Sequence, residues 1–240
     1  MDQNLKTLLG QPIEEYTGET IKPGLICYTV VPYIHDTFTV VRPVSYDSAS
    51  QDYSNLNITT TDNFKELCDN LPHTNLSLRS DEELLVSKIK KRPVVVLSHE
   101  LARVDSRGFP PHYKKTVLCA PLFTLIDSYG AYRTSYNSSV IRNVTALKYS
   151  FVFPIPGQPY LNSKISGLRM DRIHSVHTNC LKISNKKITR RWLGFIREWV
   201  RFYGTGRLTG NAKHSGNNKI AEYLQEAREL LLDAASQMND

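Results

Sequence analysis

The sequence predicts an α+β protein in which many short strands form a small barrel or a curved antiparallel sheet with helices beside it. Apolar runs of strand length recur along the chain, separated by long loops and without regularly alternating helices, which is typical of antiparallel β architectures. Helical periodicity is clearest towards the C-terminus. With 40% hydrophobic and 22% charged residues in 240, the composition is that of an ordinary globular protein rather than a disordered chain.

The predicted strands are rich in β-branched and aromatic residues and are bounded by Pro, Gly or charged residues. They cover residues 24–34, 38–44, 92–98, 116–125, 149–156, 165–177 and 180–184. The polar stretch 45–63 and the Gly- and Asn-containing stretch 205–218 predict a surface loop and a flexible linker.

Four segments predict helices. Residues 60–71 predict a short helix with Thr or Asp caps, and residues 80–91 open with Ser80 and Glu83 in capping-box spacing. In 189–204 a stripe with i, i+3, i+4 spacing predicts an amphipathic helix that stops at Gly204; it comprises Trp192, Phe195, Ile196, Trp199 and Tyr203. The last helix covers 217–238, where a similar stripe indicates a core or a partner-helix contact.

Charge is concentrated in one part of the chain. Eleven Lys or Arg and two acidic residues lie between Lys164 and Arg207, giving +9, so a net charge of +7 leaves −2 elsewhere. Such a basic region suits a phosphate backbone, and it equally fits a solvated surface or an acidic protein partner. The first twenty residues lack a basic segment followed by an apolar core, and no run reaches the roughly 18 apolar residues that span a bilayer. We therefore expect a soluble, cytoplasmic protein with no membrane partner.

The four cysteines, Cys27, Cys68, Cys119 and Cys180, are scattered and show no C-x-x-C spacing. Cys27 and Cys119 lie inside apolar runs and are predicted to be buried thiols. Neither a zinc site nor a disulfide framework is indicated, and we expect no metal and no cofactor.

The stretch 165–177, ISGLRMDRIHSVH, carries chemistry-bearing side chains on a strand-like pattern. A period of two places Arg169 and Asp171 side by side on one strand face. Two interpretations stay open at this point: a surface salt bridge on a half-buried strand, or a functional pair.

Three pieces of the chain resemble, in order, the PemK/MazF family of toxin endoribonucleases. IKPGLICYTVVP is similar to the family's opening strand, and KKRPVVVLS followed by TVLCAPLFT is similar to its Arg-Pro strand and the next strand. LRMDRIHSV is similar to the segment in which Arg and Asp are separated by one residue. The resemblance covers about 90 of the 240 residues: 21–36, 90–125 and 149–184.

This resemblance implies a compact SH3-like β-barrel (PemK/MazF/CcdB-like) with an inserted helical segment and C-terminal helices. The implied domains are an N-terminal arm (1–20), a barrel domain (21–187) with an insert (42–90), and a C-terminal helical extension (188–240). The chain departs from the family in its long insert, its C-terminal extension, and Arg172 and His174 where the family keeps Gln and Arg.

The activity implied is metal-independent cleavage of single-stranded RNA by its own 2′-OH, leaving 2′,3′-cyclic phosphate and 5′-OH ends. The matching positions imply Arg92, Arg169 and Asp171 as catalytic residues, with Thr124 (or Phe123, if the alignment shifts by one) near the family's active-site Thr. Asp171 would accept the 2′-OH proton, Arg169 would hold Asp171 ionised, and both arginines would stabilise phosphorane charge. The implied RNA-binding residues are His35, Lys164, Arg172, His174 and His177. Family members act as homodimers and are neutralised by an antitoxin protein.

Other readings of the same residues remain open. Thr124 also fits an ordinary strand residue, His35 an incidental one, and Arg92 a surface charge before Pro93. The chain also fits a non-catalytic binding module of the same fold that docks on a protein target or nucleic acid, because fold does not fix function. A nucleic-acid-binding regulator without cleavage is a further class, although no recognition-helix motif is evident.

Overall fold

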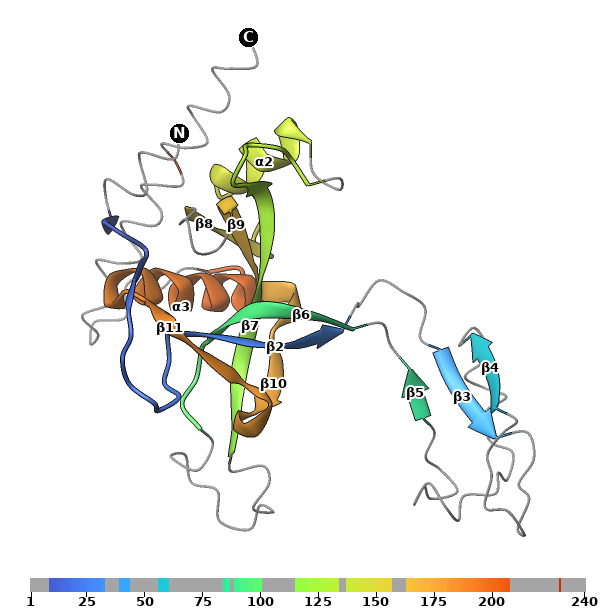
Figure 1. The fold of residues 1–240 in the computed structure, drawn as a ribbon. Helices are drawn as coiled ribbons and strands as arrows, with labels where there is room; N and C mark the ends of the chain where they lie inside the picture. Colours follow the sequence, from blue (N-terminus) through green and yellow to red (C-terminus); the bar gives the residue numbers. More distant parts are fainter. Residues whose placement is uncertain are drawn as a thin grey trace. The chain divides into compact units, whose positions relative to one another are not determined.

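The computed structural model describes residues 9–32, 39–43, 56–60, 84–86, 89–100, 115–133, 137–156, 163–207 and Glu229. The chain divides into two compact units, the first made of residues 1–29 and 91–240 and the second of residues 30–90. The first unit holds most of the secondary structure described below (Figure 1).

The described elements are mainly strands, with few helices. They are β1 (Ile13–Glu15), β2 (Leu25–Pro32), β3 (Thr39–Pro43), β4 (Leu56–Thr60), β5 (Leu84–Val86), β6 (Ile89–Val96), β7 (Thr116–Asp127), α2 (Ser138–Thr145), β8 (Val152–Pro156), β9 (Ser163–Arg169), the 3-10 turn η5 (Met170–Arg172), β10 (His174–His177), the 3-10 turn η6 (Thr178–Cys180), β11 (Lys182–Ile188) and α3 (Arg190–Thr205).

The protein is a mixed α+β fold built on an eight-stranded sheet. The strand order is β1-β11-β2-β6-β7-β9-β8, and β10 pairs with the first half of β7. Pairing is antiparallel, as in the β6–β7, β7–β9 and β8–β9 ladders. The strands predicted at 24–34, 92–98, 116–125, 149–156 and 180–184 are confirmed as β2, β6, β7, β8 and β11.

The described strands do not close into the barrel that the resemblance implied. Within the described residues the sheet is open, with β1 at one edge and β8 at the other. The sequence of β8, VFPIP, suits an edge because Pro154 and Pro156 cannot donate hydrogen bonds to a second neighbour. The alternative of an antiparallel sheet is therefore the part of the prediction that is confirmed.

The stretch predicted as one strand over 165–177 is divided. Strand β9 ends at Arg169, η5 makes a short turn, and β10 begins at His174. The interruption lets β9 pair with the second half of β7 while β10 pairs with its first half. A period-two pattern cannot reveal such a turn, because apolar spacing continues through it.

The two helices of the described part of the chain, α2 and α3, cover opposite faces of the sheet. On one face α3 buries Trp192, Phe195, Ile196 and Trp199 in a core with strand residues that include Ala120, Leu122, Phe153 and Leu168. On the other face Ile141 and Val144 of α2 pack with Leu125, Val152 and Ile165. The faces alternate along the strands, as a period of two requires: Phe153 and Leu168 contribute to the α3 core, whereas Val152 and Ile165 contribute to the α2 core.

The helix predicted over 189–204 is confirmed as α3, with its apolar stripe inside. Tyr203, assigned to that stripe, is instead 41% exposed. The helix passes Gly204 and ends before Gly206, which adopts φ 67° as a left-handed cap. Apart from Glu229, the predicted helix over 217–238 and residues 208–218 of the linker predicted over 205–218 lie outside the described residues. Thr205, the first residue of that predicted linker, belongs to α3.

The N-terminal segment is part of the sheet. Strand β1 pairs with β11 in the register Ile13↔Ile188, and Glu14 forms an ion pair with Lys187 at 2.7 Å. The indole N–H of Trp192 donates to the carbonyl of Gly10 at 3.0 Å. These contacts tie residues before β2 to both β11 and α3.

The insert contains strands where a helix was predicted. Residues 84–86 and 89–91, inside the predicted helix 80–91, belong to β5 and β6. Strand β4 lies within the stretch predicted as a loop, and β4, β3 and β5 form a three-stranded antiparallel sheet in the second unit. Pairing of β5 with the β-branched residues of β3 overrides the local helical signal, as long-range pairing commonly does. Residues 61–71 of the other predicted helix lie outside the described residues.

The prediction of buried thiols is confirmed for Cys27 and Cys119, both 0% exposed, whereas Cys180 is exposed. Burial raises the pKa of the Cys27 thiol to about 11. Burial, together with the nearby Cys27, raises the pKa of Cys119 to about 12. Both thiols therefore stay protonated at neutral pH and act as small apolar core residues.

Candidate functional site

The candidate site lies where β6, β7 and β9 meet, on the sheet face that also carries α2. In the β6–β7 ladder Val94 is opposite Pro121, and the same register two residues further along brings Arg92 opposite Phe123. In the β7–β9 ladder Phe123 is opposite Gly167, which places Arg169 two residues along the same face of β9. Residues from three strands far apart in sequence thus converge.

Three guanidinium groups surround the ring of Phe123. The Cζ atoms of Arg92, Arg172 and Arg169 lie 4.1, 5.0 and 5.6 Å from its ring centroid. These distances fall within the roughly 6 Å over which a cation is attracted to an aromatic face. We call Arg92, Phe123, Arg169, Asp171 and Arg172 the arginine cluster.

Arg169 and Asp171 form a bidentate ion pair within the cluster. Arg169 Nε donates to Asp171 Oδ1 at 2.7 Å, and a terminal guanidinium nitrogen donates to Oδ2 at 2.5 Å. The side chains are 11% and 25% exposed. The pair predicted from sequence is therefore present, although Asp171 sits in η5 and not on the same strand as Arg169. Two parallel charge-assisted hydrogen bonds fix the guanidinium plane.

Arg172, which the resemblance implied to bind RNA, is largely buried. It is only 6% exposed and lies over Phe123. Its backbone carbonyl is bound by the first residue of β10, because Nδ1 of His174 and the carbonyl oxygen of Arg172 lie 2.9 Å apart. A neutral His174 with the proton on Nδ1 would donate that hydrogen bond. His174 thus supports the turn that carries Asp171 and Arg172.

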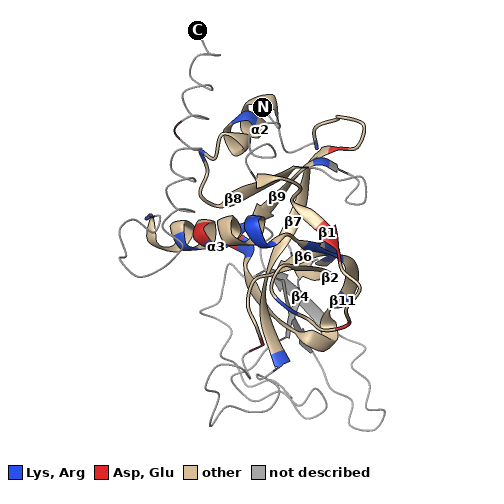
Figure 2. Ribbon diagram, turned by 90° about the vertical axis from the view of Figure 1, so that its left-hand side faces the viewer, with Lys and Arg blue, Asp and Glu red and all other residues tan. Residues whose placement is uncertain are grey.

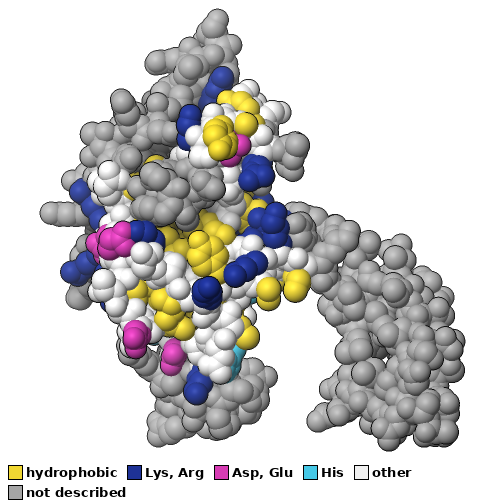
Figure 3. All heavy atoms as spheres, in the orientation of Figure 1, with side chains coloured by type: hydrophobic (Ala, Val, Ile, Leu, Met, Phe, Trp, Pro, Cys, Tyr) yellow, Lys and Arg dark blue, Asp and Glu magenta, His cyan; other side chains and the backbone are white. Residues whose placement is uncertain are grey.

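The charge and exposure of the cluster suit an anionic ligand. Three arginines and one aspartate carry a formal charge of +2, and part of Phe123 and of Asp171 remains exposed to solvent. Figure 3 shows dark-blue Lys and Arg side chains grouped beside yellow hydrophobic side chains in the orientation of Figure 1. Planar guanidinium groups recognise phosphate oxygens through paired hydrogen bonds, so the arrangement can orient a phosphate beside a carboxylate.

Several predicted residues lie away from the arginine cluster. Thr124 follows Phe123 on β7 and pairs with the buried Ser166, so strand alternation turns it to the α3 face. Lys164 is exposed at the start of β9, about 17 Å along the strand from Arg169 at roughly 3.3 Å per residue. His177 ends β10 opposite Thr116 and accepts a hydrogen bond from the Asn179 amide.

The remaining predicted residue, His35, lies outside the described residues. The basic segment from Lys164 to Arg207 is divided between the two faces of the sheet. Arg169 and Arg172 lie in the cluster, whereas Arg190, Arg191, Arg197 and Arg201 are exposed on α3, which packs on the other face. Figure 2 shows the blue Lys and Arg segments along α3.

Sequence reasoning missed the aromatic side of the site. Phe123 entered only as an alternative to Thr124, and Phe151 was not considered, yet the Arg169 Cζ lies 5.3 Å from the Phe151 ring centroid. The available signal was the position of Phe123 and Phe151 within the strands predicted over 116–125 and 149–156. Nothing in the sequence pairs them with particular arginines.

No group of three or more His, Cys, Asp or Glu in the described part of the chain is arranged to hold a metal ion. No helix among the described residues is both long and apolar enough to cross a membrane. Comparison of the chain with family models, with curated proteins and with solved structures finds no match. The resemblance to the PemK/MazF family therefore stays a prediction.

Proposed function

We propose that this protein is a metal-independent endoribonuclease that cleaves single-stranded RNA by attack of the 2′-OH on the adjacent phosphate. The products would be a 2′,3′-cyclic phosphate and a 5′-OH. The observation that supports this proposal best is the arginine cluster, in which the three guanidinium groups lie within 5.6 Å of one ring and one of them, that of Arg169, binds a carboxylate. The toxin-like biology of the family belongs to the same proposal.

The proposed division of labour follows from the chemistry of each group. The reaction needs an acceptor for the 2′-OH proton, cations for the charge that develops on the phosphorane, and a proton for the departing 5′-oxygen, which would come from solvent water. Each oxygen of Asp171 accepts one hydrogen bond from Arg169, and a carboxylate oxygen has a second lone pair that can accept from a 2′-OH. Arg92 and Arg172 would contact the non-bridging oxygens. Arginine stays protonated at any accessible pH, so its role is charge stabilisation and not proton donation.

The first test is incubation of the purified protein with a mixed-sequence RNA in EDTA, with the new ends identified by mass spectrometry. We expect cyclic-phosphate ends with the wild type. Cleavage should fall about 10²–10³-fold in Arg92→Ala, as it does when one preorganised donor to a transition-state oxyanion is removed. Arg133→Ala is the matched control, because Arg133 is an exposed arginine after β7 and outside the cluster. Equal cleavage by Arg92→Ala and the wild type would contradict the proposed role of Arg92.

One observation favours a second function, a non-catalytic module that binds a protein target or nucleic acid. Both oxygens of Asp171 are already engaged by Arg169, as in a structural ion pair. On this hypothesis Asp171→Asn would keep any growth arrest caused by expression of the protein, and no variant would alter RNA ends. On the nuclease hypothesis Asp171→Asn would lose both growth arrest and cleavage while remaining folded.

The proposed function also implies partners. Enzymes of the family that the chain resembles act as homodimers and are inhibited by an antitoxin, so we propose a homodimer and an antitoxin whose acidic or apolar segment covers the arginine cluster. Light scattering of the purified protein would measure its mass, and a value of one chain at micromolar concentration would contradict the homodimer.

A further inference from the structure

Phe151 is a large aromatic side chain that the structure leaves accessible beside the arginine cluster. It lies immediately before β8 and is 37% exposed. Its position is fixed through the backbone, because the N–H of Met170 in η5 donates to the carbonyl of Phe151 at 2.8 Å. The residue therefore stands at a defined place next to the turn that carries Asp171 and Arg172.

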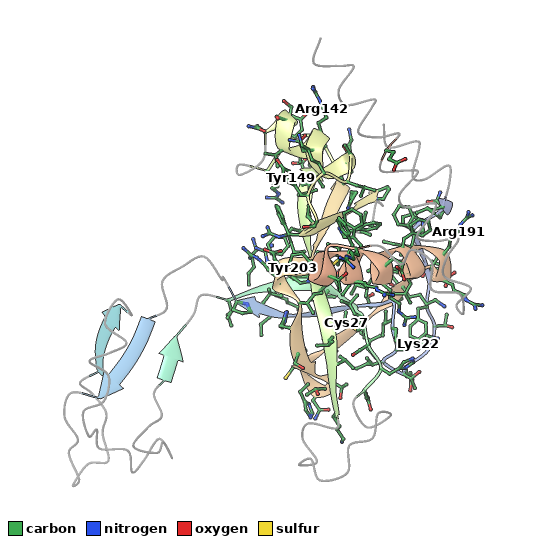
Figure 4. The ribbon with its side chains drawn as sticks, turned by 180° about the vertical axis from the view of Figure 1, so that it is seen from behind. Lys22, Cys27, Arg142, Tyr149, Arg191 and Tyr203 are labelled. Atoms are coloured by element: carbon green, nitrogen blue, oxygen red, sulfur yellow. The ribbon has the colours of Figure 1, made fainter. Side chains whose placement is uncertain are left out.

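The ring of Tyr149 packs against the ring of Phe151. The two ring centroids lie 5.3 Å apart at an interplanar angle of 30°. Tyr149 is half-buried against the apolar residues beneath α2, and its hydroxyl accepts a hydrogen bond from Asn143 Nδ2 at 3.1 Å. Figure 4 shows Tyr149 close to α2, the helix that carries Arg142. The pair is thus a braced aromatic surface and not two loose side chains.

A single side chain connects this aromatic surface to the cluster. The Arg169 guanidinium lies 5.3 Å from the Phe151 ring and 5.6 Å from the Phe123 ring, and it also binds Asp171. A phosphate held by the arginines would therefore lie one side chain away from the exposed part of the Phe151 ring. A nucleotide presents the same two features, an anionic phosphate and a planar base, at neighbouring positions.

We propose that Phe151, braced by Tyr149, stacks an unpaired nucleobase next to the phosphate held by the arginine cluster. This inference rests on the proposed function for the phosphate site, and it specifies the substrate as single-stranded nucleic acid. A base that stacks on a side chain has to be free of its own strand partners, so a duplex cannot use the surface. Any of the four bases can stack on the Phe151 ring, because this ring has no hydrogen-bonding group that would select among them.

The test measures affinity by fluorescence anisotropy, using a labelled, mixed-sequence 2′-O-methyl RNA as a single strand and as a duplex. This probe lacks the 2′-OH nucleophile, so binding is measured without cleavage. Phe151→Ala should weaken single-strand binding about 5- to 150-fold, the range found when one base-stacking aromatic is removed. Phe151→Trp should restore it. Tyr129→Ala is the matched control, because Tyr129 is 92% exposed in the turn after β7, and it should bind like the wild type.

The salt dependence separates stacking from charge. Phe151→Ala should leave the slope of log affinity against log salt unchanged, whereas Arg92→Ala should reduce it by about 0.7 for one lost phosphate contact. Circular dichroism of Phe151→Ala and the conservative Phe151→Tyr checks that both are folded. Equal single-strand affinity of Phe151→Ala and the wild type would overturn the inference, and so would an equal loss on the duplex.

Binding and cleavage measured together distinguish the inference about Phe151 from the proposed nuclease function. Phe151-dependent binding without cleavage of unmodified RNA would support the platform and contradict the nuclease. Cleavage by the wild type together with unchanged binding by Phe151→Ala would contradict the platform and leave the nuclease standing. No RNA binding by the wild type would overturn both, and would leave a protein partner as the occupant of the aromatic surface.

Discussion

Replacing Asp171 by asparagine tests whether the Arg169–Asp171 pair has a structural role, a catalytic role or both. The substitution keeps the shape of the side chain but removes its charge, so Arg169, whose side chain is only 11% exposed, loses its counter-charge. Two charge-assisted hydrogen bonds, at 2.7 and 2.5 Å, are weakened together. A hydrogen bond to a charged group contributes about 1.5–3 kcal/mol, and breaking a fully buried pair costs about 3–5 kcal/mol.

The expected loss lies below the value for a fully buried pair because a quarter of Asp171 remains exposed to water. We expect the free energy of unfolding to fall by about 2–3 kcal/mol. For a chain of this size each kcal/mol lowers Tm by roughly 2–4 °C, so Tm should fall by about 4–12 °C. Urea unfolding followed by tryptophan fluorescence measures this directly, since both tryptophans lie in the core contributed by α3.

The matched control is Glu19→Gln, which removes an exposed carboxylate from the same compact unit and should leave the urea midpoint unchanged. Cleavage is then measured at a temperature at which Asp171→Asn is still folded. Loss of both stability and cleavage is the expected result. If the variant loses 2–3 kcal/mol but cleaves RNA like the wild type, the pair is structural and Asp171 is not the base. If stability is unchanged, the argument from the ion-pair geometry is wrong.

Three further predictions concern the packing around the site. Trp192→Phe should lower the free energy of unfolding by about 1–3 kcal/mol more than Trp199→Phe does. Both substitutions remove the same side-chain volume, but only Trp192→Phe also removes an indole hydrogen bond. The indole N–H of Trp199 is buried without a hydrogen-bond partner in the described structure. Equal losses in urea titrations would contradict this. Burial raises the pKa of the Cys27 thiol from 9.0 to about 11, so the thiol of the unfolded chain ionises at a lower pH than that of the folded protein. The free energy of unfolding should therefore fall as pH rises from about 9 to about 11. The urea midpoint of Cys27→Ala should depend less on pH across that window. Gly167→Ala should destabilise the protein by about 1–3 kcal/mol, because its Cβ would lie 2.8 Å from Val152 Cγ2; an unchanged Tm in calorimetry would show that the strand shifts freely.

The sequence by itself determined the local content of the fold and the composition of the candidate site. Runs of β-branched and aromatic residues identified five strands of the main sheet, and i, i+3, i+4 spacing identified α3 with its buried tryptophans. Both are short-range properties of the chain, readable without knowing its partners. Arg169 and Asp171 were paired correctly for the same reason, because they are only two residues apart.

Only the tertiary structure decided which residues meet. Arg92 reaches Phe123 through the β6–β7 register, and Arg169 reaches it through the β7–β9 register, neither of which is encoded locally. The same alternation turns Thr124 to the opposite face, which a sequence alignment cannot show. Within the helix expected at 80–91, residues 84–86 are strand β5 because pairing with β3 outweighed their own propensity. The sequence gives the identity of each side chain, but strand register decides which side chains lie together in a site. Register depends on contacts between distant parts of the chain, because it is selected by the burial of one face of the sheet.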